Sequence, residues 1–310
     1  MLLPPCHSLY VRVYGDAETK AHESDMPRDR ALWLCNHRTR IDWMLLWSVA
    51  WRTQTLHQLR IVLKAPLRKI PIFGWAMQHF LFIFLKRRWV DDQVKLRKFL
   101  PFLKSVEPEA SYLLFPEGTD LSKNNLEKSA VFAKSNGLML RQYTLYPRTN
   151  GWTFMFPLLS SQLSAVYDVT MFYVDYASNE RPSEASLLNG RLPRMIVFYI
   201  ERVKISSLRG KSESELATWL ERRFERKESF LRTFYEENGK LPDDAQLLFQ
   251  QSQRSATAVV VAFWLVLICA TSIFISTFVS IVVSAVVATG YAMSIAYGPG
   301  IDGYLLEIFK

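Results

Sequence analysis

The sequence is poor in cysteine, with three in 310 residues. Cys6, Cys35 and Cys269 lie far apart, and Cys269 falls inside a long apolar run. Disulfide frameworks and zinc sites need paired or closely spaced cysteines, so the sequence supports neither. The chain also lacks a G-x-S-x-G motif, so it contains no serine nucleophile that this motif would identify. No internal repeat or low-complexity tract is visible.

Charge of either sign is missing from residues 255–301, a stretch of 47 residues. A membrane-spanning helix needs about 20 apolar residues, so this stretch is long enough for two. We predict a transmembrane helical hairpin over residues 255–301. One span with a re-entrant or interfacial piece is the second interpretation, and an apolar pair of core helices is the third. Residues 1–10 have no basic flank and are interrupted by Pro4 and Pro5, so no cleavable signal peptide is predicted.

The remaining composition is that of a folded protein with a concentrated positive charge. Apolar residues make up 49% and aromatic residues 14%, which excludes a disordered chain and allows one large core with an appendage. The formal net charge is +9, and residues 56–104 alone carry eleven Lys and Arg against Asp91 and Asp92. Nucleic acid, an acidic membrane and an anionic substrate are all compatible with this charge.

Apolar runs bounded by polar loops predict an α/β fold, a mixed sheet flanked by helices. The expected strands cover residues 9–14, 31–35, 61–64, 111–115, 155–159, 165–174 and 195–200. A polar loop is expected over 15–30, and an amphipathic helix over 94–106. A second helix begins at a capping box formed by Ser212 and Glu215 and runs to about residue 238.

These elements predict five segments along the chain. They are an N-terminal strand and loop at 1–30, the α/β domain at 31–205, an amphipathic helix and linker at 206–254, the transmembrane hairpin at 255–301, and a tail at 302–310.

Residues 70–85 form an aromatic segment without formal charge, followed by Lys86, Arg87 and Arg88. An aromatic surface capped by basic residues suits the headgroup layer of a membrane that contains anionic lipid. A core strand and helix with a solvated basic end explains the same pattern equally well.

His37 and Asp42 follow the apolar run at 31–35, and Asp42 comes five positions after His37. Histidine accepts a proton near neutral pH, and a carboxylate on its other ring nitrogen fixes the tautomer. On a regular helix the two side chains would point to different faces, so we expect His37 in a loop and Asp42 in the first turn of the following helix. Without a protein nucleophile, such a base would activate water or a substrate hydroxyl. A purely structural pair is the alternative interpretation.

Glu117, Gly118 and Thr119 follow the expected strand at 111–115. In a tight turn, Gly118 lets backbone amides approach a ligand and Thr119 adds a hydroxyl. Glu117 is expected to orient a cation or a hydroxyl rather than to touch phosphate. A plain β-turn is the alternative.

A set of basic residues suits binding of a phosphate, and Arg87 is its main candidate. Lys64 and Lys86 are grouped with it as candidate phosphate-binding residues. The alternative is that these cations are simply solvated or face lipid.

Together, these motifs resemble the glycerolipid acyltransferase family. They are H-x4-D at 36–43 (NHRTRIDW), the segment at 71–89 ending FIFLKRRW, and FPEGTDL at 115–121. The strings RTR at 38–40, PIFGWAMQ at 71–78 and YPRTNG at 146–151 look like the lysocardiolipin and lysophosphatidylinositol acyltransferase branch. The resemblance covers residues 10–234, with the motifs in the family's order.

The resemblance implies that His37 deprotonates a glycerol hydroxyl for attack on an acyl-CoA thioester, with Asp42 as its orienter. It further implies that Arg87 binds the acceptor phosphate and that Glu117, Gly118 and Thr119 contribute to acceptor binding. No metal and no cofactor are expected, because acyl-CoA is a co-substrate. The expected acceptor is lysophosphatidylinositol or lysocardiolipin.

Two other functions are compatible with the sequence. Acylation of lysophosphatidic acid is the close alternative, and a membrane-anchored anionic-lipid-binding protein without turnover is the distant one. Nucleic-acid binding is disfavoured, because the basic residues are interleaved with aromatics suited to a membrane. An integral protein of the endoplasmic reticulum is expected, with its catalytic domain in the cytoplasm by the positive-inside bias.

The N-terminus departs from the family pattern. Members of this branch usually begin with an additional apolar segment, which residues 1–10 are too short to supply. The chain is therefore expected either to be an isoform or fragment, or to rely on the aromatic segment and the hairpin for anchoring.

Overall fold

The computed structural model of the chain describes residues 10–174, 182–189, 193, 195–252, 277–300 and 303. The chain divides into two compact units. The larger comprises Met1–Ile61 and Pro108–Ser252, and the smaller comprises Val62–Glu107 and Gln253–Lys310.

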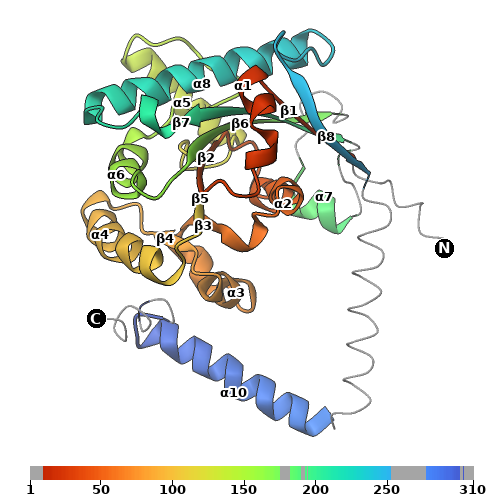
Figure 1. Cartoon of the computed structure of the whole chain (residues 1–310). Helices are drawn as coiled ribbons and strands as arrows, with labels where there is room; N and C mark the ends of the chain where they lie inside the picture. The colour runs from red at the N-terminus through yellow and green to blue at the C-terminus, as the bar shows by residue number, and fades with distance from the viewer. Residues whose placement is uncertain are drawn as a thin grey trace, which may run out of the picture. The chain divides into compact units, whose positions relative to one another are not determined.

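The larger unit is built on a mixed sheet with the strand order β3-β5-β2-β6-β7-β1-β8 (Figure 1). Its strands are β1 (Tyr10–Gly15), β2 (Ala31–Cys35), β3 (Leu59–Lys64), β5 (Ser111–Leu114), β6 (Ala165–Val174), β7 (Met195–Lys204) and β8 (Gln246–Ser252). β2 pairs parallel with both β5 and β6, whereas β6–β7 and β1–β8 are antiparallel. The expected mixed α/β sheet is therefore confirmed.

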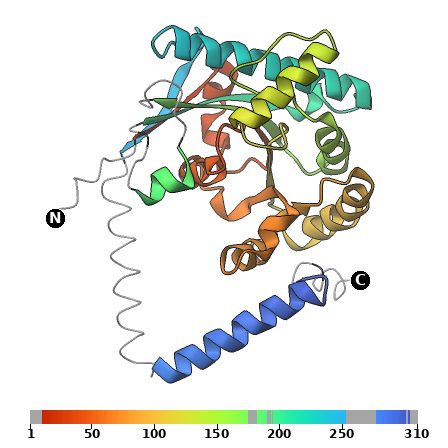
Figure 2. The same cartoon turned by 180° about the vertical axis from the view of Figure 1, so that it is seen from behind.

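Helices complete the larger unit. They are α1 (Ala17–Ala21), α2 (Asp42–Arg52), α5 (Lys123–Ser135), α6 (Thr149–Leu159), α7 (Glu184–Leu188) and α8 (Glu213–Glu236), with 3₁₀ turns at Glu23–Asp25, Leu56–Gln58 and Ile205–Ser207. The long helix α8 runs along the sheet and remains at its top when the molecule is viewed from behind (Figures 1 and 2). Buried charges attach α8 to β6, because the Lys227 ammonium lies 2.6 Å from Asp168 and donates to the carbonyl of Val169 at 2.6 Å.

The core of the larger unit lies around β2, whose five residues are all buried. Trp33 of this strand packs edge to face against Tyr167 of β6, with ring centroids 5.3 Å apart. A strand that is buried on both faces cannot alternate polar and apolar residues, which explains its uninterrupted apolar sequence. β2 therefore delivers the loop that follows it from a rigid position at the centre of the sheet.

The smaller unit contains the last three residues of β3, which pair parallel with β4 (Ile83–Leu85). It also contains the 3₁₀ turn Ala65–Lys69 and the helices α3 (Phe73–His79), α4 (Trp89–Val106) and α10 (Thr277–Ala296). Within the described residues, Val279–Ala296 of α10 is the one stretch long and apolar enough to cross a membrane. The first half of the expected hairpin lies outside the described residues.

The strand expected at 155–159 is wrong, because these residues form the second half of α6. Trp152, Met155, Phe156 and Leu159 are buried on one side of this helix. That spacing of three and four is helical, but Pro157 and the short apolar run concealed it. The Trp152 indole donates to the carbonyl of Leu216 at 2.9 Å, which fixes α6 against α8.

Two further expectations need correction. The polar segment at 15–30 is not simply a loop, because Asp16 caps the short helix α1 by accepting a hydrogen bond from the amide of Thr19 at 2.8 Å. Helix α4 begins at Trp89, five residues before the expected start at Val94. By contrast, the strand at 165–174 and the capping box of Ser212 and Glu215 are confirmed.

Candidate active site

His37 and Asp42 lie at the junction between β2 and α2. His37 sits in the loop after Cys35, and Asp42 is the first residue of α2. The imidazole Nδ1 of His37 lies 2.9 Å from Oδ2 of Asp42, and the histidine side chain is 17% exposed while the carboxylate is fully buried. The geometry expected from their spacing is therefore confirmed. Because Nδ1 is engaged, Nε2 is the ring nitrogen available to a substrate proton.

The Asp42 carboxylate accepts hydrogen bonds at both oxygens. Oδ2 also accepts from the backbone amide of Thr39 at 3.0 Å, and Oδ1 accepts from the Thr39 hydroxyl at 3.2 Å and from the hydroxyl of Tyr173. A buried carboxylate with this many donors stays in one orientation. Burial, followed by the charge of Asp42, raises the pKa of Tyr173 well above its ordinary value, so its hydroxyl remains a donor.

Glu117 contacts the backbone of His37 through its carboxylate. Its side chain is buried, and Oε1 accepts from the amide of His37 at 2.7 Å while Oε2 accepts from the amide of Leu145 at 2.7 Å. Burial raises the pKa of Glu117 to about 7, against the lowering effect of the two amides. In this structure Glu117 thus connects two backbone segments, and each of its oxygens accepts from a backbone amide.

The segment at 115–121, which contains the turn after Glu117, contacts His37. Gly118 has a positive φ of 72°, a conformation that glycine adopts without strain, and the expected tight turn is confirmed. The amide of Leu121 donates to the carbonyl of His37 at 2.9 Å, and the ring of Phe115 stacks on the imidazole with centroids 4.3 Å apart. Residues 115–121 therefore contact the backbone and the ring of the candidate base.

The hydroxyl of Thr119 is held by neighbouring polar groups. It donates to Oδ1 of Asp120 at 3.3 Å and accepts from the side-chain amide of Asn125 at 2.9 Å. The turn at 117–119 thus lies beside the backbone of His37, and the hydroxyl of Thr119 is engaged by its own neighbours.

Helix α8 supports the site through the segment at 142–145. The Glu228 carboxylate accepts from the backbone amides of Gln142 at 2.7 Å, Tyr143 at 3.0 Å and Thr144 at 2.8 Å. The next residue, Leu145, is the one whose amide binds Glu117. Two buried carboxylates therefore anchor this segment: Glu228 attaches it to α8, and Glu117 attaches it to the backbone of His37.

The expected phosphate-binding residues belong to the smaller unit. Lys64 ends β3 and is in register with Leu85 of β4, so Lys64, Lys86 and Arg87 follow the same ends of two parallel strands. All three are exposed, and Arg87 has a positive φ of 63°. The backbone register thus places these three cations at one end of two paired strands.

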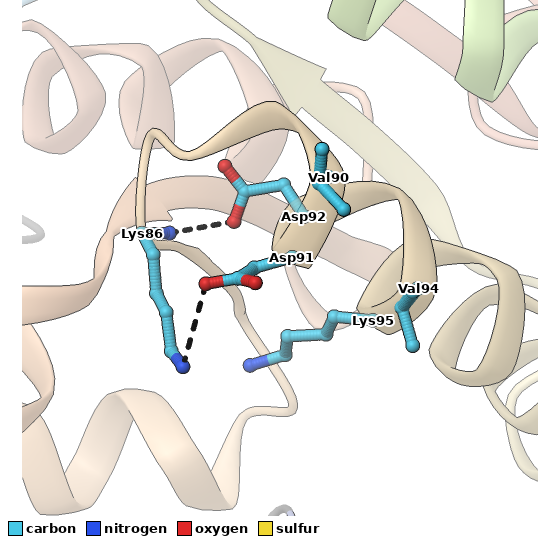
Figure 3. A pocket seen from close by; sticks show the side chains of 6 residues that line it. All are labelled: Lys86, Val90, Asp91, Asp92, Val94 and Lys95. Atoms are coloured by element: carbon cyan, nitrogen blue, oxygen red, sulfur yellow. Dashed lines mark hydrogen bonds and ion pairs between the residues drawn. The ribbon is translucent and has the colours of Figure 1, made fainter.

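Carboxylates offset part of this basic charge. Asp91 lies 2.6 Å from Arg88 and 3.9 Å from the Lys86 ammonium, and Asp92 accepts from the Lys86 amide at 2.7 Å. A pocket of about 350 Å³ (Figure 3) is lined by Lys86, Asp91 and Asp92, together with Val90, Val94 and Lys95. Its mixed charge makes it a weaker anion site than the sequence alone suggests.

Among the described residues, no group of three His, Cys, Asp or Glu could hold a metal ion. Cys35, the one described cysteine, is fully buried, and burial raises the pKa of its thiol well above the ordinary value. A thiol in that state is a poor nucleophile. At the His37–Asp42 pair, the contact of Nδ1 with Asp42 leaves Nε2 able to exchange a proton.

Comparison with known families gives a clear result. The family model described as Acyltransferase matches residues 11–171, and that described as Acyltransferase C-terminus matches residues 186–264. The chain belongs to the acyltransferase family. The match contains the β2–α2 junction and the turn at 117–119, so it includes the site described above.

Related proteins place the chain in the lysocardiolipin and lysophosphatidylinositol acyltransferase branch. Lysocardiolipin acyltransferase 1 of Gallus gallus is 39% identical over 239 residues, covering 76% of this chain and 62% of the relative. The Mus musculus protein of that name is 41% identical over 237 residues, covering 76% and 60%. Lysophosphatidylinositol acyltransferase 10 of Caenorhabditis elegans is 36% identical over 212 residues, covering 67% and 53%. The chain thus spans roughly three fifths of the length of the first two relatives.

Tyr173 and Glu228 were not expected at the site. Tyr173 is 131 residues from Asp42 in the sequence, and Glu228 is 84 residues from Thr144. Neither belongs to a short motif, and only the pairing of β6 with β2 and the packing of α8 bring them near. Tyr173 lies in a strand that also carries Asp168 and Thr170, so its hydroxyl did not stand out in the sequence.

Proposed function

We propose that this protein is an acyl-CoA-dependent lysophospholipid acyltransferase in which His37 is the general base. The observation that carries the proposal is the 2.9 Å contact between Nδ1 of His37 and the buried carboxylate of Asp42. This contact leaves Nε2 to accept a proton and stabilises the imidazolium that forms. Membership of the acyltransferase family supports the same reaction class.

We propose that the acyl group passes directly from acyl-CoA to the acceptor hydroxyl. Nε2 of His37 removes the proton from a free hydroxyl of the acceptor, and the resulting oxygen attacks the thioester carbonyl of acyl-CoA. The carbon–sulfur bond breaks as the new ester forms, and the proton on His37 neutralises the departing CoA thiolate. His37 regains its starting form, so base and acid are the same residue. No acyl-enzyme is required, in keeping with the buried state of Cys35.

The acceptor proposed here is lysophosphatidylinositol or lysocardiolipin, as the names of the relatives suggest. Lysophosphatidic acid is the alternative acceptor, because a relative from Arabidopsis thaliana that is 36% identical is named Probable 1-acyl-sn-glycerol-3-phosphate acyltransferase 5. The apolar helix α10, none of which is buried, supports anchoring in a membrane. We place the protein in the endoplasmic reticulum, with the catalytic unit in the cytoplasm.

The test is release of free CoA by the purified chain in detergent, measured with a thiol reagent. Release is expected only when both oleoyl-CoA and lysophosphatidylinositol are present, and His37→Ala should abolish it. His57→Ala is the matched control, because His57 is exposed and its side chain lies outside the site. Lipid binding without CoA release in any variant would contradict an enzymatic function. Equal release by wild type and His37→Ala would contradict the assigned base.

A second measurement separates direct transfer from a covalent route. Incubation with radiolabelled oleoyl-CoA alone should leave no label on the denatured protein. A stable labelled protein, lost on addition of the acceptor, would replace direct transfer with an acyl-enzyme mechanism.

A further inference from the structure

Arg148 lies across the turn formed by Glu117, Gly118 and Thr119. Its backbone amide donates to the carbonyl of Pro116 at 2.7 Å, which fixes the start of its side chain beside the turn. A β-carbon at Gly118 would lie 3.3 Å from Cδ of Arg148 and 3.6 Å from its Nε. The absence of a side chain at Gly118 therefore gives the arginine its position.

The turn that Arg148 covers is the one that surrounds the candidate base. Glu117 accepts from the amide of His37 at 2.7 Å, and the amide of Leu121 donates to the carbonyl of His37 at 2.9 Å. Gly118 lies between these two attachment points. Arg148 is thus held against the same short backbone segment that holds His37.

The charge of Arg148 is not neutralised within the described part of the chain. Its side chain is exposed and has no ion-pair partner there, and both oxygens of the nearby Glu117 are occupied by backbone amides. Two partly buried arginines of the larger unit differ in this respect. Arg202 pairs with Asp29 at 2.8 Å, and Arg223 pairs with Asp168 and with Glu201.

We propose that Arg148 binds a phosphate group of a substrate at this site, a role that rests on the proposed function for the identity of the ligand. A guanidinium presents paired N–H donors that match phosphate oxygens and keeps its charge at all physiological pH values. An unpaired guanidinium that extends over the turn holding His37 is suited to hold a phosphorylated substrate so that its reacting group meets the proposed base. The role is additional to that expected for Arg87, which belongs to the smaller unit.

Two substrates carry the required phosphate chemistry. One is the phosphodiester of the lysophospholipid acceptor, and the other is the phosphates of acyl-CoA. Direct binding distinguishes them, with radiolabelled lysophosphatidylinositol, oleoyl-CoA and phosphate-free monoacylglycerol as three separate probes. The full chain in detergent is used in each case.

Arg148→Ala should weaken binding of one phosphate-bearing probe by about 10- to 100-fold, because a charge-assisted hydrogen-bonding group is lost. The affinity of Arg148→Lys for that probe should fall between those of wild type and Arg148→Ala, since lysine keeps the charge but lacks the paired N–H donors of the guanidinium. Binding of monoacylglycerol should not change. Arg222→Ala, which removes an exposed arginine of α8, is the matched control and should bind every probe as wild type does.

The outcomes are distinct. Weakened binding of lysophosphatidylinositol alone assigns Arg148 to the acceptor, and weakened binding of oleoyl-CoA alone assigns it to the donor. Unchanged binding of both by a folded Arg148→Ala variant overturns the inference, even if the wild type releases CoA. Weakened binding by a protein that releases no CoA supports the role of Arg148 and contradicts the proposed reaction instead.

Discussion

The hydroxyl of Tyr173 donates a hydrogen bond to Oδ1 of Asp42, the oxygen that does not contact His37. Tyr173 is on β6 and His37 follows β2, and these two strands are neighbours in parallel register. The sheet therefore contributes to the orientation of the His37–Asp42 pair from a strand remote in sequence. Because the Asp42 carboxylate is fully buried, each donor that contacts it also lowers the cost of keeping it charged.

Tyr173→Phe should reduce turnover while leaving the KM for both substrates nearly unchanged. Losing one donor to a buried carboxylate costs on the order of 1.5–3 kcal/mol, which allows Asp42 to reorient and the imidazole with it. We expect kcat to fall by about tenfold, measured as CoA release.

Tyr167→Phe provides the control for this change. Tyr167 is also on β6 and donates to a buried carboxylate, Asp29, at 2.6 Å, but it does not contact the pair. Both variants should melt at lower temperature than wild type, and only Tyr173→Phe should turn over more slowly. Equal loss of turnover in the two variants would mean that Tyr173 affects activity only through the stability of the fold.

Asp42→Asn should lower kcat far more than Tyr173→Phe, by about 10³- to 10⁴-fold. An amide no longer favours the tautomer with Nδ1 protonated and no longer stabilises the imidazolium. The variant should still bind lysophosphatidylinositol, because Asp42 is buried and out of reach of a ligand. Turnover within tenfold of wild type would show that His37 acts without this partner.

The local part of the site could be predicted from sequence, and the distant part could not. The spacing of His37 and Asp42 spans one strand-to-helix junction, so simple helix geometry was enough to place the two side chains. Gly118 likewise marked a turn whose positive φ the structure confirms. These features depend on a few consecutive residues, so local backbone geometry is enough to predict them.

Tyr173 and Glu228 depend instead on which strands and helices become neighbours. Nothing near Tyr173 in the sequence specifies that β6 will pair with β2, and the pairing sets its contact with Asp42. The error at 155–159 has a related cause, because a short apolar run reads as a strand until the burial of Trp152 and Phe156 reveals its helical period. The spacing of the motifs likewise did not predict that Arg87 belongs to a separate compact unit.

The buried carboxyl of Glu117 should make the protein more stable as the pH falls from about 7 toward 4.5. Burial raises its pKa from 4.5 to about 7, so in this window the folded state holds a proton that the unfolded state has released. Stability must then decrease as the pH rises through the window, by an amount on the order of 3 kcal/mol for this group.

Glu117→Gln tests this pH dependence, because glutamine has the same shape and does not titrate. The melting temperature of wild type relative to this variant should fall between pH 5 and pH 7.5, measured in detergent. Parallel curves for the two proteins would contradict the raised pKa. The variant should also lose activity at every pH, since an amide NH₂ would face the amide of either His37 or Leu145 without an acceptor.

Gly118→Ala should damage both stability and phosphate binding, and comparison with Gly137→Ala separates the two effects. Both glycines have positive φ, 72° and 64°, so each alanine should cost on the order of 1–2 kcal/mol of backbone strain. Only at Gly118 does the new methyl group meet another side chain, Cδ of Arg148 at 3.3 Å, whereas Gly137 has open space. The two variants should therefore lose similar melting temperature, but only Gly118→Ala should displace Arg148 and raise the KM of a phosphate-bearing substrate. A matching rise in KM for Gly137→Ala would mean that general loosening, rather than the position of Arg148, governs substrate binding.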